Sequence, residues 1–135
     1  MSRSGYSDDC ENLALWRAAV DRAMNGARGQ HFLRKMLVAL DAMPVKRLIA
    51  EEIANDQGEV CALGAVDPDK TLDPEDRHAV GVHYGIAPAM AAEIVYMNDE
   101  GLGWRHLEET PEQRWERMRT WIDEHILPDP DDPRR

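Results

Sequence analysis

Residues 79–94 read AVGVHYGIAPAMAAEI, which is a pattern of two helices separated by a glycine turn. Gly85 ends the first predicted helix, because glycine accepts the left-handed geometry that follows many helix C-termini. Ala87-Pro88 opens the second, since proline at the first helical position lacks only an amide that has no helical partner there. Small residues at the crossing allow close packing. This stretch therefore favours an all-α fold.

Two further helices are predicted before this pair. Asp8 or Asp9 is placed to cap a helix that ends near Asn25. Its apolar residues recur at helical spacing and predict a buried side made of Leu13, Trp16, Val20, Ala23 and Met24. A second apolar stripe covers about 30–43, and Pro44 ends it.

Start signals place the remaining helices. Asp73-Pro74-Glu75-Asp76 combines a capping aspartate with proline at the first helical position, and predicts the start of the helix that ends near Gly85. Ala87-Pro88 begins a helix that Asn98-Asp99-Glu100-Gly101 ends. Thr110-Pro111-Glu112-Gln113 predicts a capping box, in which Thr110 and Gln113 bond to each other's backbone amides. The helix that follows runs to about residue 126.

Residues 45–66 carry mixed signals. Several apolar residues there fit a helical period, whereas Asn55-Asp56-Gln57-Gly58 is a turn signal between two apolar runs, as in a hairpin. We predict an extended first half and a short helix from about Val60, with one short β-hairpin around 46–64 as the alternative. The expected fold is all-α or mainly α, a compact bundle of five to six helices.

The length of 135 residues and the ordinary hydrophobic content indicate one domain. We expect a flexible N-terminus over 1–8 and a single helical domain over 9–127. Residues 128–135 contain three prolines and no apolar side chain besides them, and predict a disordered acidic tail.

Charge is the unusual property of this sequence. Asp and Glu total 26 against 16 Lys and Arg, which gives a formal net charge of −10. Such a field repels phosphate backbones and anionic lipid headgroups. Nucleic acid is therefore disfavoured as a partner, a membrane is not expected, and a protein partner with a basic surface is favoured.

Cysteine usage and the N-terminal residues predict a cytoplasmic protein. Cys10 and Cys61 form neither a Cys-x-x-Cys motif nor a disulfide framework. The first residues lack the apolar stretch of a signal peptide, and no run approaches the roughly 18 apolar residues of a membrane span.

No spacing in the sequence indicates a metal site, and no cofactor is predicted. His78 and His83 are five residues apart, about 140° around a helix, so they cannot hold one ion as an i, i+4 pair can. Cys61 is the best nucleophile candidate, since a thiol at a helix start can have a lowered pKa. Its apolar surroundings favour an inert buried thiol instead.

Two other groups of residues are candidates for binding. Asn98 and Asp99, at a predicted helix end, can clamp the next loop or hold a ligand. Trp104 lies in a glycine loop and is a natural anchor for a protein partner, with the acids Glu108 and Glu109 beside it.

The runs Val60-Cys61-Ala62-Leu63-Gly64-Ala65 and Tyr96-Met97-Asn98-Asp99 resemble a signature of small uncharacterised proteins from bacteria and their phages. Residues 109–115, ETPEQRW, resemble a recurrent ending in the same group, so the likeness covers about 45–125. The resemblance implies a shared fold and a phage or prophage setting, and no activity. It also implies that Cys61 and Gly64 pack against the helix end at Asn98-Asp99.

These observations support three hypotheses. The favoured one is a non-enzymatic acidic interaction protein that binds a basic surface of a host or defence protein, with anti-CRISPR-like inhibition as one form. The first alternative is a small-molecule-binding domain or minor enzyme centred on Cys61, Asn98 and Asp99. The second is a helix-turn-helix regulator, although its second helix carries Glu93, Asn98 and Asp99 and no arginine or lysine.

The distribution of charges along the chain leaves two possibilities open, a DNA-binding regulator and a homo-oligomer. A regulator would need a cationic face built from the basic residues of the first 47 positions, which are Arg3, Arg17, Arg22, Arg28, Arg34, Lys35, Lys46 and Arg47. Because most negative charge follows them, head-to-tail association into a homo-oligomer also stays open.

Overall fold

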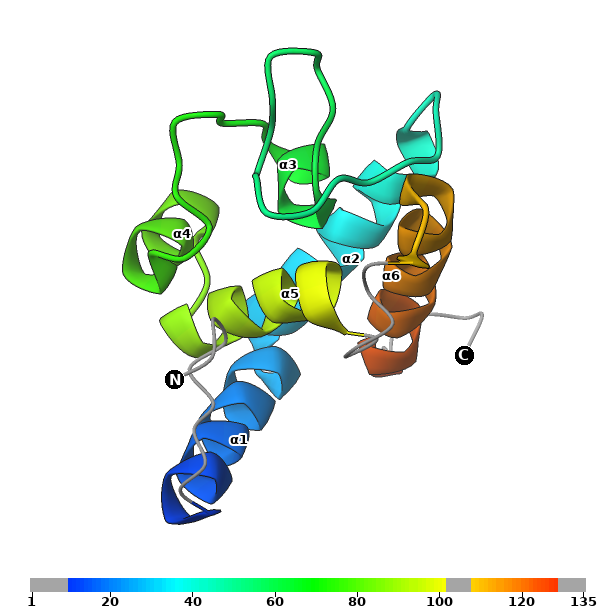
Figure 1. The fold of residues 1–135 in the computed structure, drawn as a ribbon. Coiled ribbons are helices and arrows are strands. Elements are labelled where there is room, and N and C mark those ends of the chain that lie inside the picture. Colours follow the sequence, from blue (N-terminus) through cyan, green and yellow to red (C-terminus); the bar gives the residue numbers. More distant parts are fainter. Residues whose placement is uncertain (1–9, 102–107, 129–135) are drawn as a thin grey trace.

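The structure, a computed structural model, describes residues 10–101 and 108–128. Within these ranges the chain forms helices and no strand, which confirms the all-α prediction (Figure 1). The helices are α1 (Cys10–Asn25), α2 (Ala27–Ala42), α3 (Ala62–Val66), α4 (Arg77–Tyr84), α5 (Pro88–Glu100) and α6 (Pro111–His125). None of them is both long and apolar enough to cross a bilayer.

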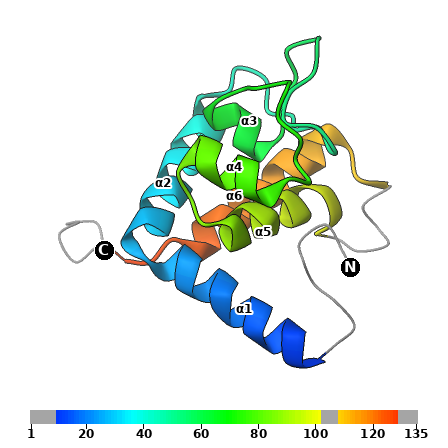
Figure 2. The ribbon, with the colours of Figure 1, turned by 90° about the vertical axis from the view of Figure 1, so that its left-hand side faces the viewer.

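Helix α5 lies at the centre of the bundle. It packs against α1, α3, α4 and α6, while α2 packs against α1, α3 and α6 on the far side of the core (Figures 1 and 2). The side chains that fill this space are apolar and almost fully buried, and include Leu33, Met36 and Leu40 of α2, Met90 and Ile94 of α5, and Met118 and Ile122 of α6. Helices α2 and α6 therefore each present one apolar face to a shared core, whereas α5 is buried on several sides.

The turn between α4 and α5 forms as predicted. Gly85 has φ 70° and ψ 33°, the left-handed geometry, and its amide bonds back to carbonyls of α4. Ile86 donates its amide to the oxygen of Gly81 at 3.0 Å. A Cβ atom at Gly81 would lie 2.8 Å from the Ile86 oxygen, so this position needs glycine for the tight return.

The start of α4 differs from the prediction. Asp73 accepts the amide of Glu75 in a local turn, and Asp76 caps the helix by accepting the amide of Ala79 at 3.1 Å. Asp73 and Asp76 could each cap this helix, and in the structure Asp76 does so. The capping box at α6 is confirmed, since Thr110 Oγ1 accepts from Gln113 N at 3.1 Å and Gln113 Oε1 from Thr110 N at 2.9 Å.

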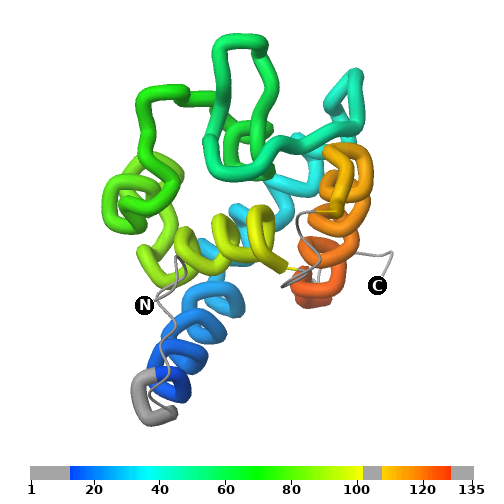
Figure 3. Tube along the Cα trace, viewed as in Figure 1, coloured from blue at the N-terminus to red at the C-terminus, as the bar shows by residue number. Residues whose placement is uncertain are grey.

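The long connection between α2 and α3 contains one isolated antiparallel bridge, Ala54 with Val60, in place of a full hairpin (Figure 3). Asn55 closes the turn between them, because its Oδ1 accepts the amides of Gln57 and Glu59. The predicted extended half and short helix are both present, although α3 begins two residues later than Val60.

The first half of α1 is less buried than its apolar spacing predicted. Val20 and Met24 are in the core, whereas Leu13 is 39% exposed and Leu15 is 71% exposed. Figure 1 shows the reason, because this half of α1 projects beyond the other helices. Asp8 and Asp9, the predicted caps of this helix, lie outside the described residues, as do 1–7 of the predicted N-terminus and 129–135 of the predicted tail.

Candidate functional site

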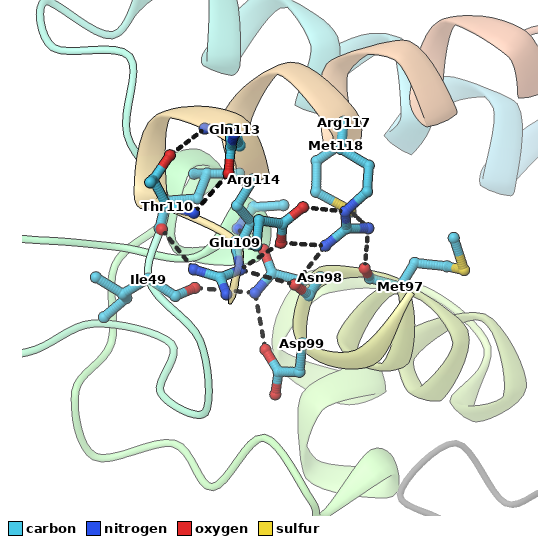
Figure 4. Close-up of polar contacts among 12 residues, drawn as sticks. Ile49, Met97, Asn98, Asp99, Glu109, Thr110, Gln113, Arg114, Arg117 and Met118 are labelled. Atoms are coloured by element: carbon cyan, nitrogen blue, oxygen red, sulfur yellow. Dashed lines mark hydrogen bonds and ion pairs between the residues drawn. The ribbon is translucent and has the colours of Figure 1, made fainter. Parts of the chain in front are cut away.

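Asn98, at the C-terminal end of α5, joins three segments of the chain. Its Oδ1 accepts the amide of Ala62, the first residue of α3, at 3.1 Å. Its Nδ2 donates to the oxygen of Ile49 at 2.9 Å and to Oδ1 of Asp99 at 2.8 Å (Figure 4). The side-chain amide is thus bonded at both ends within the protein, and the residue is buried.

Two arginines of α6 reach the same helix end. The backbone oxygen of Asn98 accepts from Nε of Arg114 at 3.1 Å and from Nη2 of Arg117 at 3.0 Å. Arg114 also donates to the oxygen of Leu48 at 3.2 Å. The last carbonyls of a helix lack intrahelical partners and carry the negative end of its dipole, so guanidinium groups are well placed there.

Glu109 balances these cations. Its carboxylate accepts from Nε of Arg117 at 2.6 Å and from Nη2 at 2.9 Å, and lies 3.3 Å from Nε of Arg114. The side chain of Glu109 is only 1% exposed. Glu108 and Glu109 were both predicted to contact a partner. Glu109 is instead buried and paired with arginines of α6, whereas Glu108 is exposed.

Cys61 lies beside this network as the N-cap of α3, and it is buried. Burial raises the pKa of its thiol to about 12, and the nearby charge of Asp99 acts in the same direction. At neutral pH the group is a protonated thiol, which is a poor nucleophile. The helix start does not lower its pKa enough to offset burial.

The resemblance implied that Cys61 and Gly64 pack against the end of α5. Cys61 does lie near Asn98 and Asp99, through the bond from Ala62. Gly64 instead faces the connection before α3, because a Cβ atom there would lie 2.1 Å from the oxygen of Ile53. Glycine is therefore needed for the contact with Ile53.

The described part of the chain contains no group of three or more histidine, cysteine or acidic side chains placed to hold a metal ion. His83 pairs with carboxylates of the preceding loop, at 3.0 Å from Asp67 and 3.9 Å from Asp69. Asp67 and Asp69 therefore connect the loop before α4 to that helix.

A hollow of about 780 Å³ lies next to the arginine network, between the end of α5 and one side of α6. The α6 residues along it recur at three- and four-residue spacing and so share one face of the helix. The described residues that line it are Met97, Gly101, Glu108, Glu109, Gln113, Glu116, Arg117, Thr120, Trp121 and Glu124.

Sequence reasoning did not identify Arg114, Arg117, Glu116 or Glu124. The usable signal was the spacing of Gln113, Glu116, Thr120 and Glu124, which marks a polar stripe next to the apolar stripe of the same helix. Trp104, the predicted anchor, lies outside the described residues.

Comparison with protein-family models gave no match for this chain, and comparisons with curated proteins and with solved structures gave none either.

Proposed function

We propose that this chain is a non-enzymatic interaction protein whose acidic surface binds a basic surface of a partner protein. The observation that carries this proposal is that most lysine and arginine side chains in the described part of the chain already have contacts within it. The formal net charge is −10. The field that reaches a neighbouring molecule is therefore dominated by carboxylates on the surface.

The internal contacts of the cations are specific. Arg47 pairs with Glu112 at 3.0 Å, and Lys70 pairs with Asp56 at 2.9 Å. The others bond to carboxylates or backbone oxygens or lie over an aromatic ring, and are Arg17, Arg34, Lys46, Arg77, Arg114, Arg117 and Arg119. Within residues 10–101 and 108–128, the exceptions are Arg22, Arg28 and Lys35.

This distribution also weighs against the regulator hypothesis. Of the basic residues required for its cationic face, Arg17, Arg34, Lys46 and Arg47 have contacts within the fold, and Arg3 lies outside the described residues. The would-be recognition helix, α5, is the central helix of the bundle and is buried over most of its length. Burial of this helix among the others weighs against its insertion into a DNA groove.

The small-molecule or enzyme hypothesis required Cys61, Asn98 and Asp99 to converge on a concave pocket. These residues are buried, and the amide of Asn98 is fully used by the backbone of the protein and by Asp99. The hollow beside α6 is lined by other residues. The geometry therefore supports the interaction hypothesis better.

The resemblance to small proteins of bacteria and phages leads us to expect a host or defence protein as the partner, with inhibition of the anti-CRISPR kind as one outcome. Electrostatic complementarity mainly accelerates association and selects partners, and it is screened by salt. The proposal therefore predicts a specific dependence on ionic strength.

The test is a pull-down from a host lysate with the immobilised full-length chain, read by mass spectrometry at low salt and at about 1 M salt, where the Debye length falls to about 3 Å. The expected result is a retained set that is more basic than the input and is released by salt. Retention of proteins no more basic than the lysate, or retention that salt does not affect, would overturn the proposal.

A further inference from the structure

We infer that two copies of this chain exchange α1, so that the α1 of each copy packs on the α5 of the other. The exchange takes place when the bend between α1 and α2 straightens at Gly26 and the two helices become one. The partner is a second copy of the chain, because the surface that α1 covers already fits α1.

A single residue separates α1 from α2, and the two helices meet there at a bend (Figure 2). Gly26 has φ −72° and ψ 166°, so only its ψ departs from helical geometry. Helical bonds are present on both sides, from Gly26 N to the oxygen of Arg22 at 3.1 Å and from Gln30 N to the oxygen of Gly26 at 2.9 Å. Rotation about this one bond would continue the helix over residues 10–42, for about 50 Å at 1.5 Å per residue.

The bend is held by a side chain, whereas a straight helix would be held by backbone bonds. The first amides of α2 begin a helix whose N-cap, Gly26, provides no side-chain acceptor. In a continuous helix they would donate to carbonyls of the last turn of α1. One of these carbonyls, that of Met24, accepts instead from Nε2 of Gln30 at 2.9 Å. The segment after α6 fixes this side chain, because Gln30 also donates to the oxygen of His125 at 2.9 Å and accepts the amide of Leu127 at 2.7 Å.

Gly29 allows the bend because it has no side chain. A Cβ atom there would overlap the oxygen of Ala23 and lie 3.1 Å from Cα of Met24, because the start of α2 lies against the last turn of α1. This contact belongs to the bend, since residues six apart do not meet in this way along one α-helix. A side chain at position 29 therefore opposes the bent form and not the straight helix.

The surface beneath α1 suits the α1 of another copy. Val20 and Met24 are buried in the core, and α1 packs on α5. Arg17 of α1 pairs at 2.9 Å with Glu93 of α5, whose side chain is 5% exposed. An exchanged α1 would make the same contacts across the dimer, so that neither copy leaves this surface uncovered. Short hinges favour the exchange of whole elements between copies of a chain.

The test compares the hinge variants Gly26→Ala and Gly26→Asn of the full-length chain, refolded from urea at a series of concentrations and studied by sedimentation equilibrium. Both add a Cβ atom that would lie 3.3 Å from the oxygen of Arg22 in the bent form, so this contact cancels. Asparagine caps the start of α2, whereas alanine is the better residue within a helix. With two hinges in a dimer and about a five-fold effect at each, the alanine variant should have a dimer Kd about 30-fold lower. Equal Kd values, or only monomers, would overturn the inference.

Gly29→Ala should shift the equilibrium further, because the bent form cannot accept the added methyl group and the straight helix gains a better helix former. We expect this variant to be a dimer at concentrations at which the unsubstituted chain is a monomer, with circular dichroism showing that it is folded. A folded monomer would contradict the inference. The hinge pair at Gly26 decides the matter even if Gly29→Ala unfolds.

Complementary charge variants distinguish exchange from the association of intact copies. In the Gly26→Ala background, Arg17→Glu in one chain and Glu93→Arg in another each place like charges together within a copy. Refolded together, the two chains should form heterodimers beyond the statistical share, as measured by native mass spectrometry, because exchange lets opposite charges meet at both contacts. The control mixture is Arg47→Glu with Glu112→Arg, a pair that stays within one copy when α1 moves. If the first mixture gives no more heterodimer than the control, α1 is not exchanged.

Discussion

Arg117 and Glu109 form a two-point ion pair that holds α6 against the end of α5. The bonds are 2.6 Å from Nε to Oε2 and 2.9 Å from Nη2 to Oε1, and the glutamate side chain is almost completely buried. The same guanidinium bonds to carbonyl oxygens of Met97 and Asn98. One side chain thereby connects the end of α5, the residues just before α6 and α6 itself.

Removing Glu109 should destabilise the fold strongly. Glu109→Ala leaves Arg117 without its carboxylate partner and Arg114 with one fewer acid nearby, and breaking a buried pair in this way costs about 3 kcal/mol of the free energy of unfolding. Urea unfolding of the variant measures the loss. Glu112→Ala, at an exposed ion pair in the first turn of the same helix, is the control and should cost less than about 1 kcal/mol. Equal losses would show that the Glu109 pair is not a buried interaction.

Asn98 is expected to be as sensitive to substitution. Asn98→Ala leaves the buried amide of Ala62 and the partly buried oxygen of Ile49 without their partner, and a buried group left in this way costs about 1 to 3 kcal/mol. Asn98→Asp should be worse, because a carboxylate cannot donate to Ile49 and places a second negative charge beside Asp99. Thermal unfolding of the two variants gives their order, and a more stable Asp variant would contradict these contacts.

The helices were predictable because their signals lie within a few residues. The capping box of Thr110 and Gln113 and the left-handed Gly85 are local patterns with one structural meaning each. Local spacing also gave the buried faces of most helices. It failed for Leu13, because spacing predicts which side of a helix is apolar and cannot say whether another helix lies against it.

The contacts of the candidate site were not predictable for a related reason. Arg114 bonds to the oxygen of Leu48, 66 residues away, and Asn98 bonds to Ile49, 49 residues away. Both acceptors are backbone oxygens, which every residue possesses, so no residue type in the sequence marks them as partners. Asn98 was identified as a clamp or ligand candidate from its helix-end position, but its partners required the tertiary arrangement.

Cys61 should be unreactive while the protein is folded. Its pKa of about 12 leaves almost no thiolate at neutral pH, and burial blocks access. In a Cys10→Ser background, a thiol reagent at about neutral pH should modify Cys61 only after urea is added. Modification of the folded protein at the rate of a free thiol would contradict the structure.

The same raised pKa makes stability depend on alkaline pH. In the unfolded chain the thiol has its ordinary pKa of 9.0, whereas in the folded protein it stays protonated until its pKa of about 12. The contribution of Cys61 to stability is therefore complete below pH 9 and is lost as the pH rises toward 12. Cys61→Ala should remove this part of the pH dependence, as measured by urea unfolding at a series of pH values against the unsubstituted chain.

Two glycines allow close packing to be separated from backbone conformation. Gly64 has an ordinary backbone, but a Cβ atom there would lie 2.1 Å from the oxygen of Ile53 and 2.9 Å from Cβ of Val60. Because that oxygen accepts the amide of Cys61, it cannot move without breaking the bond. Gly64→Ala should therefore cost about 3 kcal/mol. Gly85 has φ 70°, and a Cβ atom there would meet no other atom within 4 Å, so Gly85→Ala should cost only the left-handed strain of about 1 kcal/mol.

These two substitutions add the same methyl group, so the difference between them compares the cost of a clash at Gly64 with the cost of left-handed strain at Gly85. Urea unfolding of both variants gives that difference directly. If Gly85→Ala proved the more damaging, the turn between α4 and α5 would limit the stability of the fold more than the packing of α3 does. A larger loss at Gly64 would instead mean that α3, which also provides the amide held by Asn98, is positioned by its approach to the preceding connection.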